Sequence, residues 1–315
     1  MKKALIKLHI AIFLAGTSGL FGKWVSLDET ALVWYRVLLS LIILGLALIV
    51  TGRFKTLPFE HFLRIGSAGV ILVAHWLFVD ASSKAANVSV GVVCLSAVAF
   101  ITALIEPIFS KEAHFSLKDI LLSIISVLGI VCIFSFDSQY RLGITYGIIS
   151  STLVALLMIA NKQLRTLKIR TPKGFQKSEF EGKRYSAWFL LFIELCCGFI
   201  ALSVFILLST FFTNGLSLGE SFNAIALNYT PTQTDWTYLA VLAAVVTITP
   251  YALKIDALKY ISAFTVNLAN NMEPVYSIIL AAIFFNELEE LNLSFFIGLG
   301  LIALSVALQT LNLNR

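Results

Sequence analysis

The stretch that decides the fold is KYISAFTVNLANNMEPVYSIILAAIFFNE, residues 259–287. About 20 apolar residues are enough to cross a bilayer, and this stretch is longer and bounded by charge at both ends. Its middle nevertheless carries polar side chains beside a proline: Asn267, Asn270, Asn271, Glu273, Ser277 and Pro274. An acidic side chain at the bilayer centre costs roughly 2.5–3.5 kcal/mol on insertion scales, so Glu273 is a candidate functional residue.

On a helix these polar side chains form one stripe on an otherwise apolar surface. The stripe has two interpretations. It is either a substrate site in which Glu273 supplies the charge, or a set of asparagines that hydrogen-bond neighbouring helices. Pro274 frees a backbone carbonyl at the same depth, which favours the functional interpretation for Glu273.

The same stretch has a weak repeat 175 positions earlier, in residues 84–112. In this register Trp76 corresponds to Tyr251 and Ser96 to Asn271, which predicts an aromatic pair across a pseudo-twofold axis. Glu273 has no acidic counterpart. Glu106, beside Pro107, aligns elsewhere and is interpreted as marking the end of a helix. Internal repeats in membrane-spanning halves are typical of transporters.

The composition excludes an ordinary soluble protein, because 58% of the residues are hydrophobic and 13% are charged, with a mean hydropathy of +0.90. Apolar runs of spanning length predict an all-α integral membrane protein with ten transmembrane helices. Their expected ranges are 4–25, 31–51, 62–82, 86–110, 117–136, 142–162, 186–212, 234–254, 260–285 and 293–312.

The distribution of Lys and Arg predicts the orientation. With the N-terminus inside, the cytoplasmic joints and ends receive all of the 23 basic residues except Lys23, Arg36, Lys84 and Arg141. Both termini are therefore expected in the cytoplasm. The basic segment 162–185 divides the chain into a first repeat, 1–161, and a second, 186–315. Five helices in each half give the two repeats inverted topologies.

Further candidate site residues lie outside the stripe. Trp76 and Tyr251 would form aromatic walls for an amphipathic or cationic substrate, although ordinary packing explains either ring alone. His75 is either a proton relay or a neutral side chain bound to a carbonyl. Glu194 lies deep in the seventh predicted helix, and Arg36 is close enough to the outer edge for its side chain to reach the interface.

The chain lacks the sequence motifs of several classes of enzyme and metal-binding protein. There is no Walker loop, dinucleotide-binding glycine turn, nucleophile elbow or metal-binding His/Cys cluster, so we expect no enzyme activity, cofactor or metal. The four cysteines lie in apolar runs and are interpreted as packing residues. The net charge of +5 is confined to particular joints, which argues against nucleic acid as a partner.

The chain resembles the EamA-type family of the drug/metabolite transporter superfamily. The resemblance rests on Pro274 and Glu287 in MEPVYSIILAAIFFNE and on the closing helix SFFIGLGLIALSVAL. The first half retains Glu112 but has Ala99 where a proline would align. The resemblance implies an inverted-repeat bundle, a central cavity lined by both halves, alternating access and a small metabolite as cargo.

These observations predict a secondary transporter of the cytoplasmic membrane that exports a small, amino-acid-like metabolite. The predicted substrate-binding residues are Glu273, Asn267, Asn270, Asn271, Ser277, Trp76, Tyr251, His75 and Glu194. Its other partners would be membrane lipids, with protons as a candidate coupling ion. The alternatives are a proton-coupled antiporter of cationic drugs and an integral membrane enzyme or lipid-handling protein.

Overall fold

A computed structural model describes residues 2–27, 29–55, 57–85, 94–95, 97–110, 113–133, 141–167, 185–214, 230–285 and 293–313. Throughout these ranges the regular structure is helical. The helices are α1 (Lys2–Gly16), α2 (Ser18–Trp24), α3 (Glu29–Val50), α4 (Phe59–Ala85), α6 (Ala97–Phe109), α7 (Leu117–Ile133), α8 (Arg141–Leu164), α10 (Ala187–Asn214), α12 (Gln233–Val241), η2 (Leu242–Ile248), α13 (Thr249–Ala257), α14 (Ala263–Asn270), α15 (Met272–Phe285) and α16 (Leu293–Leu313).

Helix occupies the described part of every predicted span, so the all-helical fold class is confirmed. Within the described residues, five helical stretches are long and apolar enough to cross a membrane: Thr30–Val50, Phe59–Val79, Arg141–Leu164, Ala187–Phe212 and Gln233–Ala257. Most of the basic segment 162–185 lies outside the described residues, as do Ser96, Glu112 and Glu287.

Within the described residues, three predicted spans are interrupted rather than continuous. The first is divided at Thr17 into α1 and α2, and the ninth is divided at Asn271 into α14 and α15. Pro274 cannot donate a backbone hydrogen bond to the carbonyl of Asn270, which accounts for the division. The eighth contains the π-helix η2, which ends two residues before Pro250, whose missing N–H disturbs the preceding turn in the same way.

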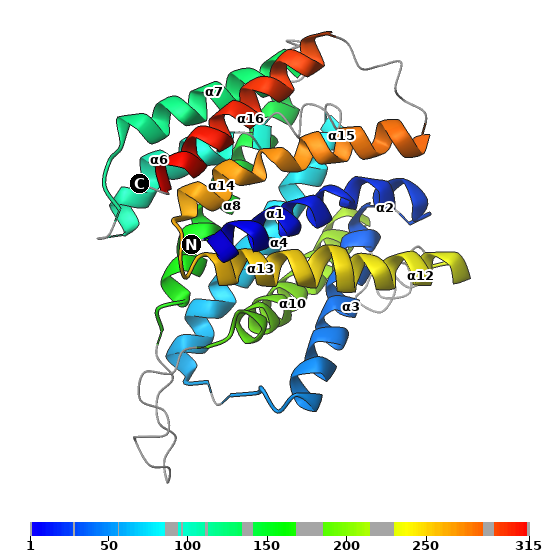
Figure 1. Cartoon of the computed structure of the whole chain (residues 1–315). Coiled ribbons are helices and arrows are strands. Elements are labelled where there is room, and N and C mark those ends of the chain that lie inside the picture. Colours follow the sequence, from blue (N-terminus) through cyan, green and yellow to red (C-terminus); the bar gives the residue numbers. More distant parts are fainter. Residues whose placement is uncertain are drawn as a thin grey trace, which may run out of the picture.

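The two ends of the chain lie at the same end of the helices (Figure 1). There α1 packs beside α13, and Lys7 forms an ion pair of 3.0 Å with Asp256. At the other end of the same two spans, Asp235 accepts hydrogen bonds from the backbone N–H and the hydroxyl of Ser26, at 2.8 and 2.6 Å. The first and eighth spans are therefore fastened together at both ends.

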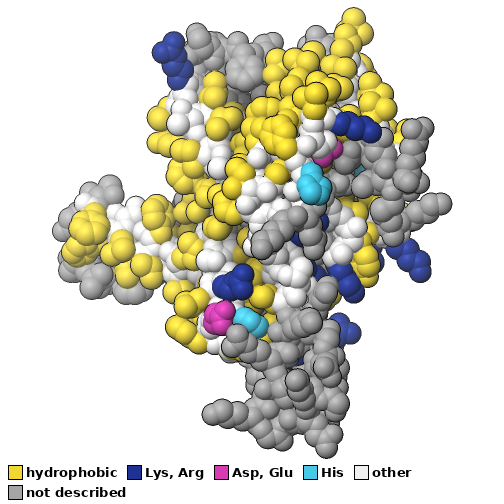
Figure 2. All heavy atoms as spheres, turned by 90° about the vertical axis from the view of Figure 1, so that its left-hand side faces the viewer, with side chains coloured by type: hydrophobic (Ala, Val, Ile, Leu, Met, Phe, Trp, Pro, Cys, Tyr) yellow, Lys and Arg dark blue, Asp and Glu magenta, His cyan; other side chains and the backbone are white. Residues whose placement is uncertain are grey.

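Figure 2 views the molecule from the end where both termini lie. Lys and Arg side chains are spread over this face, and hydrophobic side chains cover much of the remaining described surface. Exposed apolar residues such as Ile49, Leu128 and Ile200 suit contact with lipid rather than water. The orientation of the termini stays a prediction.

Helices α4 and α10 approach each other closely at two glycines. A Cβ atom added at Gly69 would lie 2.0 Å from the backbone oxygen of Glu194, and one added at Gly198 would lie 2.8 Å from the backbone oxygen of Gly69. Glycine is therefore required at both positions for the backbones to approach this closely. The contact holds Glu194 against the third predicted span.

Candidate functional site

The predicted aromatic pair is formed. The rings of Trp76 in α4 and Tyr251 in α13 lie edge to face, with centroids 5.7 Å apart and planes at 86°. This contact confirms the proximity predicted from the 175-residue repeat. It joins the two halves of the chain near the centre of the bundle, where Trp76 is largely buried.

Two cations lie on this pair, one from each half. The guanidinium carbon of Arg36 in α3 is 4.9 Å from the Trp76 ring centroid, and Arg36 Nε donates a hydrogen bond of 2.6 Å to Thr247 of η2. Lys254 Nζ is 5.6 Å from the Tyr251 ring centroid and 3.2 Å from the Glu273 carboxylate. A cation over an aromatic ring in a desolvated site is worth up to about 2 kcal/mol.

We name these six residues the central cluster: Arg36, Trp76, Thr247, Tyr251, Lys254 and Glu273. The Lys254 side chain is 7% exposed, whereas that of Glu273 is 36% exposed. Glu273 therefore offers an accessible carboxylate whose counterion is buried. Tyr251 contacts both the Trp76 ring and the ammonium group of Lys254, so it links the aromatic pair to the buried cation.

The roles of Arg36 and Lys254 in this cluster were not predicted from the sequence. Lys254 was assigned to the basic residues of a cytoplasmic joint, but α13 extends to Ala257 and buries Lys254 inside the eighth span. Arg36 does not turn to the outer interface, because Trp76 and Thr247 hold its guanidinium inside the bundle. The sequence offered one signal for Lys254, namely its helical spacing of three residues from Tyr251.

The polar stripe of the ninth span is divided among several neighbours. Asn267 donates to Thr102 of α6 and Asn271 to Ser126 of α7, each at 2.7 Å, and Ser277 donates to the backbone oxygen of Gly16 at 2.6 Å. These are interhelical hydrogen bonds, as the second interpretation of the stripe predicts. Asn270 carries a buried side-chain oxygen without a hydrogen-bond partner. Substrate binding by these four residues stays a prediction.

His75 is buried and contacts α8. Its Nδ1 lies 2.7 Å from the hydroxyl of Ser150, and that hydroxyl donates to the backbone oxygen of His75 at 3.1 Å. Because the hydroxyl donates to the carbonyl, its oxygen is available to accept from an Nδ1–H. The contact favours the structural interpretation of His75 over a proton relay.

Glu106 lies in the last turn of α6, as its interpretation as a helix boundary predicts, and its side chain has a further structural role that the sequence did not indicate. It is 3% exposed, and its carboxylate accepts the backbone N–H groups of Ala263 and Phe264 at 3.1 and 2.9 Å. These N–H groups open α14, where a helix has unpaired donors. A glutamate of the first half thus caps a helix of the second half.

Glu194 lies in α10 with no exposed surface, and it faces Asn161 of α8, which is equally buried. The sequence singled out Glu194 but not Asn161. None of the four polar side-chain atoms of the two residues has a hydrogen-bond partner within the described part of the chain.

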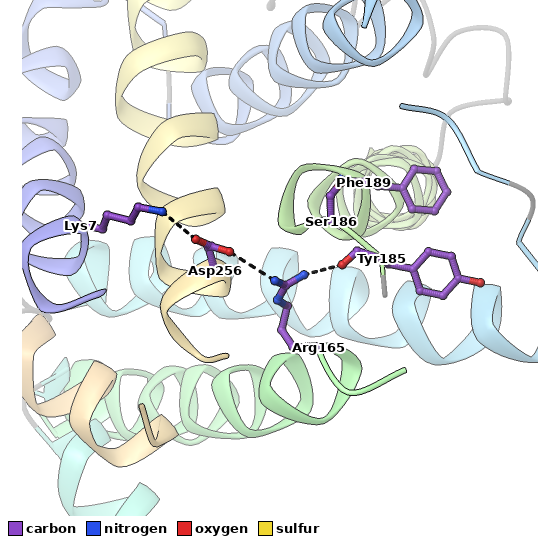
Figure 3. A network of polar contacts seen from close by, with 6 residues as sticks. All are labelled: Lys7, Arg165, Tyr185, Ser186, Phe189 and Asp256. Atoms are coloured by element: carbon purple, nitrogen blue, oxygen red, sulfur yellow. Dashed lines mark hydrogen bonds and ion pairs between the residues drawn. The ribbon is translucent and has the colours of Figure 1, made fainter. Parts of the chain in front are cut away.

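A second polar cluster lies at the end of the bundle that carries both termini. Asp256 pairs with Lys7 at 3.0 Å and with Arg165 at 3.3 Å, and Arg165 also donates to the backbone oxygen of Tyr185 (Figure 3). We name these four residues the Asp256 network. They line an open hollow of about 740 Å³ together with Lys259 and Trp188. Over the described ranges, no group of His, Cys, Asp and Glu could hold a metal ion.

Comparison with known proteins places this geometry in a family. The model of the EamA-like transporter family matches twice, over residues 2–135 and 182–311. A solved structure entitled "Crystal structure of protein" is similar with a TM-score of 0.71 and 14% identity, over 99% of this chain and 99% of that chain. At that identity the likeness concerns the fold alone. The comparison with curated proteins returns no match. Because the two family matches cover most of the chain, this multi-pass membrane protein belongs to the EamA-like transporter family.

Proposed function

We propose that the protein is a secondary transporter that exports a small, amino-acid-like metabolite across the cytoplasmic membrane by alternating access. The observation that carries the proposal is the central cluster. It brings Arg36, Lys254 and Glu273 around one aromatic pair contributed by both halves. A zwitterion needs a cation for its carboxylate and an anion for its ammonium group, and the cluster contains both.

The charge of the cluster distinguishes this substrate from a cationic drug. Two cations and one carboxylate give a net positive site, which would repel a cation and attract a carboxylate. We therefore rank the antiport of cationic drugs second. That alternative gains support from the aromatic rings and from the partial exposure of Glu273.

The proposed architecture has ten spans in two inverted repeats, 1–161 and 186–315, joined by the basic segment 162–185, with both termini in the cytoplasm. The two family matches and the charged face at the end with both termini support it. Single cysteines at positions 175 and 222 test the topology. Position 175 should react from inside and position 222 from outside, and the reverse pattern would exclude this architecture.

The functional test is the metabolite-release profile of cells with and without the protein, followed by flux measurements in proteoliposomes. Arg36→Gln should reduce amino-acid flux by about 10- to 150-fold, because a charge-assisted hydrogen bond is worth roughly 1.5–3 kcal/mol. Arg53→Gln is the matched control, since Arg53 is exposed in a joint between spans. Flux of organic cations without flux of amino acids would select the second function.

A further inference from the structure

Glu194 and Asn161 form a buried polar pair that the central cluster does not use. Both residues have 0% exposed surface. Both carboxylate oxygens of Glu194, and both the Oδ1 and Nδ2 atoms of Asn161, lack hydrogen-bond partners in the described structure. Asn161 lies beside the carboxylate, although the present rotamers form no hydrogen bond between the two side chains. Four unsatisfied polar atoms in one place are unusual for a protein interior.

Among the described residues, no ion pair with this carboxylate is formed. Helices α3, α4 and α13 pack against α10, and Asn161 belongs to α8. The charged or titratable side chains of these helices nearest the cluster and the hollow are Arg36, His61, His75, Lys162, Arg165, Tyr251, Lys254 and Asp256. Arg36 binds Thr247, Lys162 donates to the backbone oxygen of Ile261, and Arg165 pairs with Asp256. His61 contacts Tyr185, His75 contacts Ser150, and Lys254 pairs with Glu273.

The chemistry of the pair favours one additional proton. An ionised carboxylate buried without a cation or hydrogen bond costs several kcal/mol. A neutral carboxylic acid has one donor and one acceptor, and so does the facing edge of an amide. With the proton present, the acid can donate to Asn161 Oδ1 and accept from Asn161 Nδ2, which would give each of the four atoms a hydrogen-bond partner. Without the proton, the Glu194 carboxylate cannot donate a hydrogen bond to Asn161 Oδ1.

We propose that Glu194 is the proton-binding residue of this transporter and that Asn161 is its hydrogen-bonding partner. The position of Glu194 suits a coupling site. Asn161 lies one helical turn before Arg165, which lines the hollow with Asp256 and Lys7 (Figure 3). On the other side, the backbone of Glu194 contacts Gly69 of α4, and Trp76 of the central cluster lies two helical turns farther along the same helix. Glu194 is thus linked to the hollow through α8 and to the proposed substrate site through α4.

Proton binding can be tested without transport. The test records the infrared carbonyl absorption of protonated carboxylic acids in the purified full-length protein at neutral pH, in sodium-free buffer. We expect a band that Glu194→Gln removes and that Asn161→Leu shifts by removing its hydrogen bond. The matched control is Glu106→Gln, which alters a buried glutamate already bound by two backbone N–H groups and should leave the band unchanged. A parent protein without such a band, or a band that survives Glu194→Gln, would overturn the proposal.

The coupling role rests on the proposed transport function and needs a second measurement. In proteoliposomes, a pH gradient should drive amino-acid accumulation by the parent, and Glu194→Gln should lower that accumulation at least about tenfold while substrate exchange continues. Unchanged accumulation in the variant would refute coupling through Glu194. If the parent protein shows the infrared band but no amino-acid flux, the proton site is upheld and the proposed function is refuted. If Glu194→Gln does not fold, Asn161→Leu replaces it in both the infrared measurement and the accumulation measurement.

Discussion

The ion pair between Lys254 and Glu273 gives the sharpest prediction for stability. Two unit charges 3.2 Å apart attract by about 5 kcal/mol at an effective dielectric constant of 20 and by about 1 kcal/mol in water. Lys254 is buried, but the Glu273 side chain is 36% exposed, so solvent screens part of the attraction. The desolvation of Lys254 offsets a further part. We expect a coupling free energy of about 1–2 kcal/mol between the two side chains.

A double-mutant cycle measures this coupling. Glu273→Gln and Lys254→Met should each lower the thermal stability of the detergent-solubilised protein. Glu273→Gln should do so because it leaves a buried cation without its carboxylate. The double variant should recover about 1–2 kcal/mol relative to the sum of the two single losses. Strictly additive losses would refute the ion pair as a stabilising contact. A Glu273→Gln variant as stable as the parent would do so as well, because the buried Lys254 would then need no counterion.

Three other predictions follow from the packing and from the aromatic pair. Cysteines at positions 76 and 251 should be protected together by substrate from thiol reagents, and protection of neither with full transport in Trp76→Ala and Tyr251→Ala would assign both rings to packing. Gly69→Ala should destabilise the protein by about 1–3 kcal/mol in thermal unfolding, because the new methyl group overlaps the Glu194 backbone; no loss would contradict the close contact. Glu106→Ala should cost about 1–2 kcal/mol by uncapping α14, and Glu106→Gln should cost less because it retains one acceptor.

The aromatic pair shows how far sequence reasoning reaches into the site. Trp76 and Tyr251 are separated by the 175-residue offset of the weak repeat, and this offset led to the prediction that the two rings pair. The prediction needed no knowledge of how either helix is rotated. The asparagine stripe lacked such a constraint. Its common face on one helix was predictable, but its hydrogen bonds to Thr102, Ser126 and the backbone of Gly16 depend on which helices surround it.

The positions of two helix interruptions, but not their form, could be predicted from the sequence. Pro274 and Pro250 each remove a backbone donor, so a disturbance of the preceding turn could be expected at both. The form of the disturbance differs, since the ninth span divides at Asn271 while the eighth forms the π-helix η2. Packing decides between these outcomes, and Arg36 binding to Thr247 is one tertiary contact of the π-helix.

The sequence by itself determined the helical class, the positions of the spans and the presence of charge within them. Long apolar runs, and the cost of unpaired backbone groups in lipid, allow few other structures. The tertiary structure alone decided that Lys254 pairs with Glu273, that Arg36 turns inward and that Glu194 faces Asn161. The reason is physical. Lipid is as apolar as a helix interface, so hydrophobic periodicity does not reveal which face of a span turns towards which neighbour.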